Sequence, residues 1–249
     1  DFINAMWYQR KLSVPSDWKG KEILLNFGAV YYQAAIYVDG KFVMSHTGGS
    51  SSFSANITRY VIPGKTHNLI VQVKDDLRSG RQPGGKQSTN FFSQGCSYTR
   101  VTGIWQTVWM EAVSPEGLRS VYACPDIDQQ QLVVHPQFYH ESENKLTATV
   151  LDGNKVVVTK SVRCANNDIL VLPIKKMKLW SPESPFSYKI IYKITDKEGK
   201  VIDEVRSDAG MRKVAVKNGL VDLNNRPYHQ RLVWDRGYYP AGECTATAD

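Results

Sequence analysis

Short runs of strand-forming residues, separated by turn-forming residues, recur along almost the whole of this chain. Residues 23–27, 35–38, 41–44 and 69–73 are rich in apolar, β-branched and aromatic side chains. Short runs of this kind, bounded by glycine, aspartate or asparagine, are typical of β-strands. Before residue 117 no segment repeats its apolar residues with the 3.6-residue period of an amphipathic helix. The pattern therefore predicts an all-β sandwich for the first part of the chain.

The same pattern continues after a turn-rich boundary at residues 114–117, which read Ser-Pro-Glu-Gly. Two strand–turn–strand units follow, over residues 146–158 and 188–202. Regularly spaced short strands over about 95 residues predict an immunoglobulin-like sandwich. The cysteines do not have the Cys…Trp…Cys spacing of antibody domains, so this prediction concerns the architecture alone.

Glycines and aromatic residues mark two further places in the first part. Gly48 and Gly49 allow positive φ where the chain turns back after a hairpin, and we expect the neighbouring strands to bury Phe53. Gly103 separates a polar loop from a run of β-branched and aromatic residues at 104–109, which predicts a strand there.

Length and composition fit an ordinary globular protein. The chain has 249 residues, of which 42% are hydrophobic and 22% charged, enough for one large or two ordinary domains with real cores. No apolar run approaches the ~20 residues that a membrane helix needs, and no secretory signal peptide is recognisable. We therefore expect no membrane partner, and the sequence leaves a periplasmic or a cytoplasmic location open.

The net charge of +7 raises the question of nucleic acid. Nucleic-acid binders concentrate their basic residues on one face or stripe. Here the excess is spread thinly, and the densest cluster, 175–178, is short, so we expect no nucleic-acid partner. The cysteines show neither CxxC nor Cys/His ligand spacing, which favours neither a zinc site nor a disulfide scaffold. We expect no metal and no cofactor.

Three blocks carry a family resemblance through their order and spacing: residues 48–58, residues 83–87 (Pro-Gly-Gly-Lys-Gln) and residues 98–111 around Gly-Ile-Trp. Together they resemble the N-terminal sugar-binding sandwich of glycoside hydrolase family 2, the family of β-galactosidases, β-glucuronidases and β-mannosidases. The resemblance implies a galactose-binding-like jelly roll over residues 1–116, lacking its first strand or strands. An immunoglobulin-like β-sandwich over residues 117–211 would follow.

The last part of the chain resembles the family's transition into its catalytic domain. Residues 179–185 are similar to a signature loop of the second domain, and 210–214 to the linker strand. Residues 223–228 resemble the asparagine-turn hairpin that opens the family's TIM barrel, which makes 231–234 the expected first barrel strand. Residues 212–249 are thus expected to be a short stub of a barrel that needs roughly 250 residues.

The resemblance implies a function for the intact protein and none for this chain alone. Family members are exo-acting, retaining β-glycosidases, and their two catalytic glutamates lie on later barrel strands. We therefore expect no catalytic residue here, and expect the chain to be an inactive N-terminal portion whose partners are its own TIM-barrel domain and a carbohydrate substrate. The sequence leaves the identity of the β-glycoside and the formation of a homo-oligomer open.

Six residues are candidates for contact with substrate. Chemistry in a TIM barrel lies at the C-terminal ends of the strands, which places Asp235 and Arg236 at that face, in an Asp-x-Gly-Tyr-Tyr-Pro motif that resembles a bacterial branch of the family. In several relatives the loop before the Gly-Ile-Trp strand also reaches the barrel mouth. That loop contributes Lys86, Gln87, Ser97 and Arg100, and the alternative role of these four is hydrogen bonding that fixes a long loop.

Two other classes of function fit parts of the sequence. A free-standing carbohydrate-binding module would present an aromatic platform drawn from the 6 Trp and 13 Tyr residues. Such a module has no reason to end in the opening hairpin of a barrel. An immunoglobulin-like adhesion protein explains the second sandwich but leaves residues 210–249 unexplained.

Overall fold

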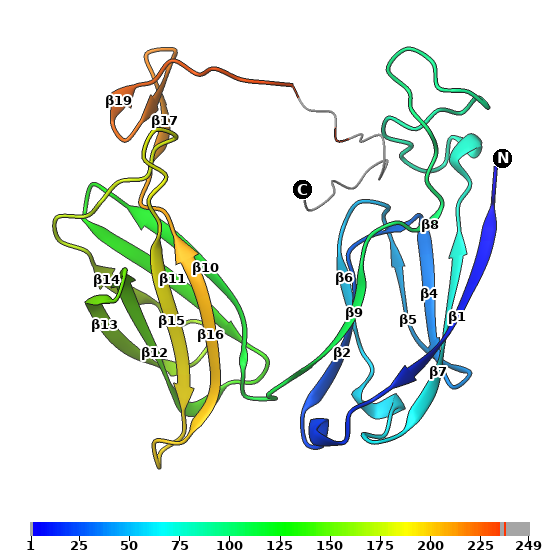
Figure 1. Ribbon diagram of the computed structural model, residues 1–249, viewed down its shortest axis with the longest axis horizontal. Coiled ribbons are helices and arrows are strands. Elements are labelled where there is room, and N and C mark those ends of the chain that lie inside the picture. Colours follow the sequence, from blue (N-terminus) through cyan, green and yellow to red (C-terminus); the bar gives the residue numbers. More distant parts are fainter. Residues whose placement is uncertain (1, 235–236, 238–249) are drawn as a thin grey trace. The chain divides into compact units, whose positions relative to one another are not determined.

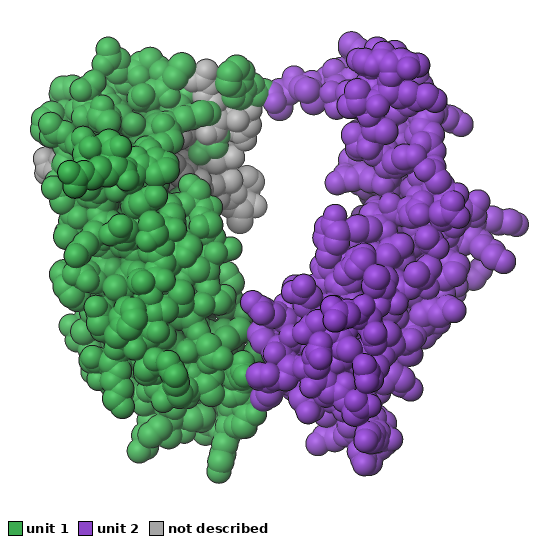
Figure 2. Space-filling model, turned by 180° about the vertical axis from the view of Figure 1, so that it is seen from behind, with its two compact units in different colours: residues 1–113, 234–249 green, residues 114–233 purple. Residues whose placement is uncertain are grey.

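The computed structural model describes residues 2–234 and Gly237 and divides the chain into two compact units (Figure 1). Of the described residues, the first unit contains 2–113 with Trp234 and Gly237, and the second contains 114–233; Figure 2 colours the two units separately. In the described residues the only helical segments are three short 3₁₀ turns, at Ser16–Trp18, Thr58–Tyr60 and Leu77–Ser79. The prediction of an all-β chain is confirmed.

The first unit is an antiparallel sandwich of a four-stranded sheet, in the order β1-β7-β4-β5, and a three-stranded sheet, in the order β6-β2-β9. A short pair, β3 and β8, lies at one end. The strands are β1 (Ala5–Ser13), β2 (Glu22–Phe27), β3 (Val30–Tyr31), β4 (Gln33–Val38), β5 (Lys41–Thr47), β6 (Phe53–Asn56), β7 (Thr66–Lys74), β8 (Gly103–Ile104) and β9 (Val108–Val113). Apolar residues at alternate positions, such as Leu69, Val71 and Val73 of β7, form the core between the sheets.

The hairpin turn between β4 and β5 has the backbone conformation that its residues favour. Asp39 and Gly40, between β4 and β5, have φ of 47° and 76°, as a two-residue turn of the primed type requires. Phe53 is only partly buried, and its ring stacks on Phe27 and on His46, with centroids 4.7 and 4.1 Å apart. Phe53 is therefore covered partly by neighbouring rings at the end of β6 and not fully enclosed by strands.

The second unit contains a sandwich of a three-stranded sheet, β10-β11-β14, and a four-stranded sheet, β13-β12-β15-β16. The strands are β10 (Leu118–Asp126), β11 (Gln131–Phe138), β12 (Ser142–Asp152), β13 (Lys155–Cys164), β14 (Leu170–Pro173), β15 (Tyr188–Thr195) and β16 (Val201–Ala209). Leu132, Leu146, Leu172 and Ile190 are buried between the sheets, with at most 1% of their surface exposed. The immunoglobulin-like prediction for this part is confirmed.

A small antiparallel sheet follows the second sandwich, made of β17 (Val214–Lys217), β18 (Leu220–Leu223) and β19 (Arg226–Pro227). Its second turn is the expected asparagine turn. Residues 231–234, the expected first barrel strand, form no strand in this chain. A strand is held by hydrogen bonds to a neighbouring strand, so the first barrel strand at 231–234 stays a prediction for the intact protein.

Candidate functional site

The loops at one end of the first sandwich enclose a pocket of about 490 Å³, which we name the loop-end pocket. Residues from all three blocks that carry the family resemblance meet in it. Its lining residues are Tyr31, Tyr32, Gly48, Gly49, Ser50, Ser51, Pro83, Gly84, Gly85, Lys86, Gln87, Val101 and Trp105. The fold therefore brings separate parts of the sequence together at one place.

Tyr31 of β3 is a buried residue in the lining of this pocket. Only 7% of its surface is exposed, and its hydroxyl donates a hydrogen bond to the carbonyl of Pro83. Burial, and then the nearby Asp75 carboxylate, raise the pKa of the Tyr31 phenol, because both disfavour the phenolate. The Tyr31 hydroxyl is therefore held neutral, as a fixed donor to the loop.

Gly49 is required by the Tyr31 ring. A Cβ at position 49 would lie 2.0 Å from Cδ2 of Tyr31, far inside van der Waals contact. Trp105 adds a second link, because its indole nitrogen donates a hydrogen bond of 2.8 Å to the carbonyl oxygen of Gly49. The backbone of this turn is thus held between two aromatic side chains.

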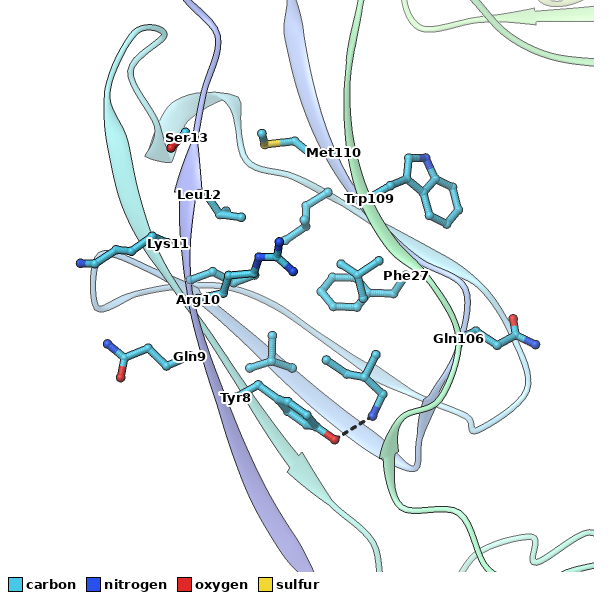
Figure 3. Close-up of a pocket in the computed structure, with 15 residues that line it drawn as sticks. Tyr8, Gln9, Arg10, Lys11, Leu12, Ser13, Phe27, Gln106, Trp109 and Met110 are labelled. Carbon is cyan, nitrogen blue, oxygen red and sulfur yellow. Dashed lines mark hydrogen bonds between the residues drawn. The ribbon is translucent and has the colours of Figure 1, made fainter. Parts of the chain in front are cut away.

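Gly103, two residues before Trp105, helps to set the position of Trp105. β8 pairs with β3 through Tyr31 and Gly103, and Gly103 has φ of 88°. A Cβ there would lie 2.1 Å from the hydroxyl oxygen of Tyr8, which itself accepts a hydrogen bond from the amide of Ile104 (Figure 3). Both the positive φ and the close contact require glycine at the hinge.

The long loop of residues 76–102 is anchored near both ends by one carboxylate. Buried Asp75 accepts hydrogen bonds from the Gln82 amide at 2.7 Å and from the Thr102 hydroxyl at 2.6 Å. Farther along, the side-chain oxygen of Gln87 accepts a hydrogen bond of 2.6 Å from the amide of Val101. These contacts fix the wall of the loop-end pocket.

The structure places the predicted contact residues differently from one another. Lys86 and Gln87 line the loop-end pocket, and Lys86 is exposed there. Ser97 forms a tight turn through two backbone hydrogen bonds with Gln94, of 2.9 and 3.0 Å, and lies outside the lining. Arg100 also lies outside it.

Arg100 instead holds the tip of the loop. Its guanidinium lies 4.3 Å from the ring centroid of Phe2 and donates to the carbonyls of Asn90 and Phe91. Asp235 and Arg236, the other two predicted contacts, lie outside the described residues. Ser97 and Arg100 thus bond to other parts of the protein and do not line the loop-end pocket, whereas Lys86 does.

Sequence reasoning missed the aromatic residues Tyr31 and Tyr32. A Tyr-Tyr pair beside a short strand carries no local signal, because only the pairing of β3 with β8 brings it to the other two blocks. Aromatic faces with a rim of hydroxyl and ammonium groups are suited to binding a polar ring. None of the residues that line the loop-end pocket is acidic, so the lining offers no pair of carboxyl groups.

The described residues offer little for other kinds of site. No group of three or more His, Cys, Asp or Glu side chains among them is placed to hold a metal ion. Within the same residues, no helix has the length and apolar character to span a membrane.

Comparisons with known proteins agree with this architecture. Residues 2–114 match the family model "Glycosyl hydrolases family 2, sugar binding domain", and residues 118–212 match "Glycosyl hydrolases family 2". A β-galactosidase of Thermoanaerobacter pseudethanolicus is 26% identical over 242 residues, and a β-glucuronidase of Paenibacillus borealis is 23% identical over 243. These alignments cover 93% and 92% of this chain but only 31% and 40% of the two relatives.

A solved structure gives the same picture. The β-glucuronidase from Ruminococcus gnavus in complex with D-glucuronic acid matches with a TM-score of 0.80 at 23% identity, over 99% of this chain and 43% of that one. The fold is therefore that of the N-terminal domains of such enzymes. Because two consecutive family models account for most of its residues, this chain belongs to glycoside hydrolase family 2.

Proposed function

We propose that this chain is the non-catalytic N-terminal portion of a retaining, exo-acting β-glycosidase. One observation carries the proposal: the two family 2 matches follow one another along a chain that spans less than half of the β-galactosidases and β-glucuronidases it resembles. The intact protein would hydrolyse terminal β-glycosides. The two sandwiches would serve as its scaffold.

The small sheet after the second sandwich supports a further domain in the intact protein. Val214, Val216 and Leu220 are 65%, 77% and 58% exposed, although strands of this composition normally cover a core. Leu232 and Val233 are 79% and 93% exposed. We propose that the protein's own TIM barrel covers these side chains.

The chemistry of the reaction would come from that barrel. A retaining glycosidase needs two carboxyl groups roughly 5–5.5 Å apart, one as nucleophile and one as acid/base. The loop-end pocket carries no carboxylate. We propose that both glutamates lie beyond residue 249 and that the chain alone has no hydrolytic activity.

The substrate contacts we propose from this chain are Lys86 and Gln87 on the wall of the loop-end pocket, and Asp235 with Arg236 at the barrel mouth. Ser97 and Arg100 would act by holding the loop that carries Lys86. The relatives' names include both β-galactosidase and β-glucuronidase, so the proposal extends to β-glycosides as a class.

The test is a comparison of two proteins on chromogenic β-galactoside, β-glucuronide and β-mannoside substrates. The product of the complete reading frame should hydrolyse at least one of them, and the purified 249-residue chain should hydrolyse none above background. Turnover by the 249-residue chain that is lost on mutating one of its own carboxylates would overturn the proposal.

A further inference from the structure

Three hairpin turns of this protein place glycine directly after aspartate or asparagine: Asp39-Gly40, Asp152-Gly153 and Asn218-Gly219. They join β4 to β5, β12 to β13, and β17 to β18, each an antiparallel pair. The glycine has a positive φ in every case, of 76°, 59° and 76°, which only glycine adopts without strain. Asn218-Gly219 is the one asparagine–glycine pair in the sequence.

A side chain of this kind, when glycine follows it, is able to react with its own main chain. The backbone nitrogen of the next residue lies within reach of the side-chain Cγ, and its attack closes a five-membered ring. Glycine carries no Cβ that would crowd this approach. A neutral carboxamide accepts the attack more readily than a negatively charged carboxylate does. Asn218 is therefore the most reactive of the three by chemistry alone.

The two aspartates are also held in place by hydrogen bonds. The Asp39 carboxylate accepts from the ring of His67 at 2.6 Å and from the backbone amide of Asn68 at 2.7 Å. The Asp152 carboxylate lies 2.7 Å from the ammonium group of Lys178. Turning either carboxylate towards the following amide would break these contacts.

Asn218 has no such restraint. Among the described residues, none forms a hydrogen bond with its side chain, and none accepts one from the backbone amide of Gly219. Residues 217–220 are all exposed. The other turn of the same sheet differs, because the side chains of Asn224 and Asn225 are both hydrogen-bonded to the second sandwich. Both reacting groups of Asn218-Gly219 are thus available.

The hairpin that carries Asn218 is also small enough to open locally. β17 is an edge strand in the order β17-β18-β19, and no strand of this sheet is longer than four residues. Segments with few buried contacts and exposed backbone hydrogen bonds open at a small fraction of the free energy of global unfolding. Local opening lets the Asn218 side chain rotate until its Cγ faces the Gly219 nitrogen.

We propose that Asn218 is a site of spontaneous deamidation, and that the product loosens the hairpin of β17 and β18. The Gly219 nitrogen loses its proton and bonds to Cγ of Asn218, the bond from Cγ to the side-chain nitrogen breaks, and ammonia leaves. Water then opens the succinimide. Attack at the side-chain carbonyl gives aspartate, and attack at the backbone carbonyl gives isoaspartate.

Isoaspartate changes the turn itself. Its main chain runs through the β-carbon, which adds one carbon to a two-residue turn whose length fixes the pairing of Lys217 with Leu220. Both products also place a negative charge where Asn218 is neutral. The inference does not depend on the proposed activity.

Peptide mass spectrometry tests the reaction in the product of the complete reading frame, incubated at mildly alkaline pH in water labelled with ¹⁸O. We expect an acidic residue that carries the label at position 218, formed in proportion to the hydroxide concentration because the Gly219 amide must lose its proton. Asp39-Gly40 and Asp152-Gly153 are controls within the same molecule. Their labelling should be at least about ten-fold slower, since their side chains must first break hydrogen bonds.

Hydrogen exchange tests the consequence in the same samples. In the isoaspartate fraction the amides of β17 and β18 should be at least about ten-fold less protected than in fresh protein, because the register of the hairpin is lost. Asn218→Gly is the matched variant, since glycine fits the φ of 51° at this position and has no carboxamide. Its protection should not change during the incubation.

Three results would overturn the inference. The first is the absence of label at position 218 in the folded protein when the urea-unfolded protein gains it, because the folded turn would then prevent the attack. The second is labelling of Asp39 or Asp152 as fast as that of Asn218. The third is an equal loss of protection in wild-type protein and in Asn218→Gly.

Discussion

Single glycines in the first sandwich are explained by contacts that the sequence does not display. The Gly48-Gly49 pair reads as a turn, and Gly48 does have a positive φ of 134°. Gly49 is different, because its φ is not positive and the Tyr31 ring occupies the space of a side chain. The need for glycine at 49 is therefore a long-range effect that no local pattern predicts.

Gly49→Ala tests this explanation. The added methyl group must displace a buried ring or the turn that accepts the Trp105 hydrogen bond, and overpacking of this kind costs about 1–3 kcal/mol. Denaturant unfolding of the first sandwich should show a loss in that range. Ser50→Ala is the matched control, since Ser50 is exposed. If Gly49→Ala lost no more unfolding free energy than Ser50→Ala, the explanation would be contradicted.

Asp235→Ala tests the residue we place at the barrel mouth. A lost hydrogen bond to a charged group is worth about 1.5–3 kcal/mol. In the intact protein the variant should therefore reduce kcat/KM by roughly ten- to a hundred-fold. Glu198→Ala, in an exposed turn of the second sandwich, should leave it unchanged. Wild-type kinetics in a folded Asp235→Ala variant would assign Asp235 a structural role.

At the level of elements, side-chain hydrogen bonds fasten the small sheet to the second sandwich. The Asn224 side chain accepts from the amide of Lys213 at 3.1 Å and donates to the carbonyl of Trp180 at 2.9 Å. The Asp128 carboxylate, in the turn between β10 and β11, binds the Lys213 ammonium and accepts from the Asn225 amide at 2.7 Å. Two loops of the sandwich thus hold the asparagine turn.

Two asparagines in the turns of this sheet provide a test substitution and a matched control. Asn224 and Asn218 both have positive φ, of 55° and 51°, so glycine fits the backbone at either position. Asn224→Gly removes two hydrogen bonds of about 0.5–1.5 kcal/mol each and should lower the exchange protection of β17 and β18 roughly ten-fold. Asn218→Gly should have little effect. Equal loss of protection in both variants would contradict the claim that the Asn224 side chain fastens the small sheet to the second sandwich.

The Asp128 contact has a predicted pH dependence. Hydrogen bonds from Lys213, and then from Asn225, hold the pKa of the Asp128 carboxyl below its ordinary value of 3.8. The folded form therefore favours the carboxylate, and this stabilisation is present above the unfolded pKa and lost as the pH falls through the folded one. The NMR signal of the Asn225 side-chain amide should titrate with a midpoint below 3.8. A midpoint at or above 3.8, or the same titration in Asp128→Ala, would contradict this.

The strands were predictable from the sequence because alternation and turn chemistry are local. The hairpin of β4 and β5 around Asp39-Gly40 shows this most clearly. The pairing of β3 with β8 was not predictable, since it joins residues about 70 positions apart and leaves no pattern of its own. The single strand predicted over 104–109 is divided between β8 and β9, with no strand at 105–107. Residues 231–234 carry strand-forming residues and yet form no strand, because a strand also needs a neighbour.

At the scale of the molecule, the sequence indicates membership of glycoside hydrolase family 2, and the structure shows the loop-end pocket. The resemblance rested on three blocks, and two family models now match residues 2–114 and 118–212. The three blocks meet at the loop-end pocket because β3 pairs with β8. The sequence alone therefore could not place Tyr31 and Trp105 on one wall. Of the predicted contacts that the structure describes, Lys86 and Gln87 share that wall. Ser97 bonds within the loop, and Arg100 bonds to the loop and lies over the Phe2 ring.

The most direct test of the central claim is to trap the reaction in the intact protein. A retaining glycosidase forms a covalent glycosyl-enzyme intermediate, which a 2-fluoro glycoside of the hydrolysed class accumulates, and peptide mass spectrometry then locates the label. We predict a single label on a glutamate C-terminal to residue 249, and no label on the 249-residue chain under the same conditions. A label on a carboxylate within residues 1–249 would contradict the account that this chain is scaffold and substrate wall.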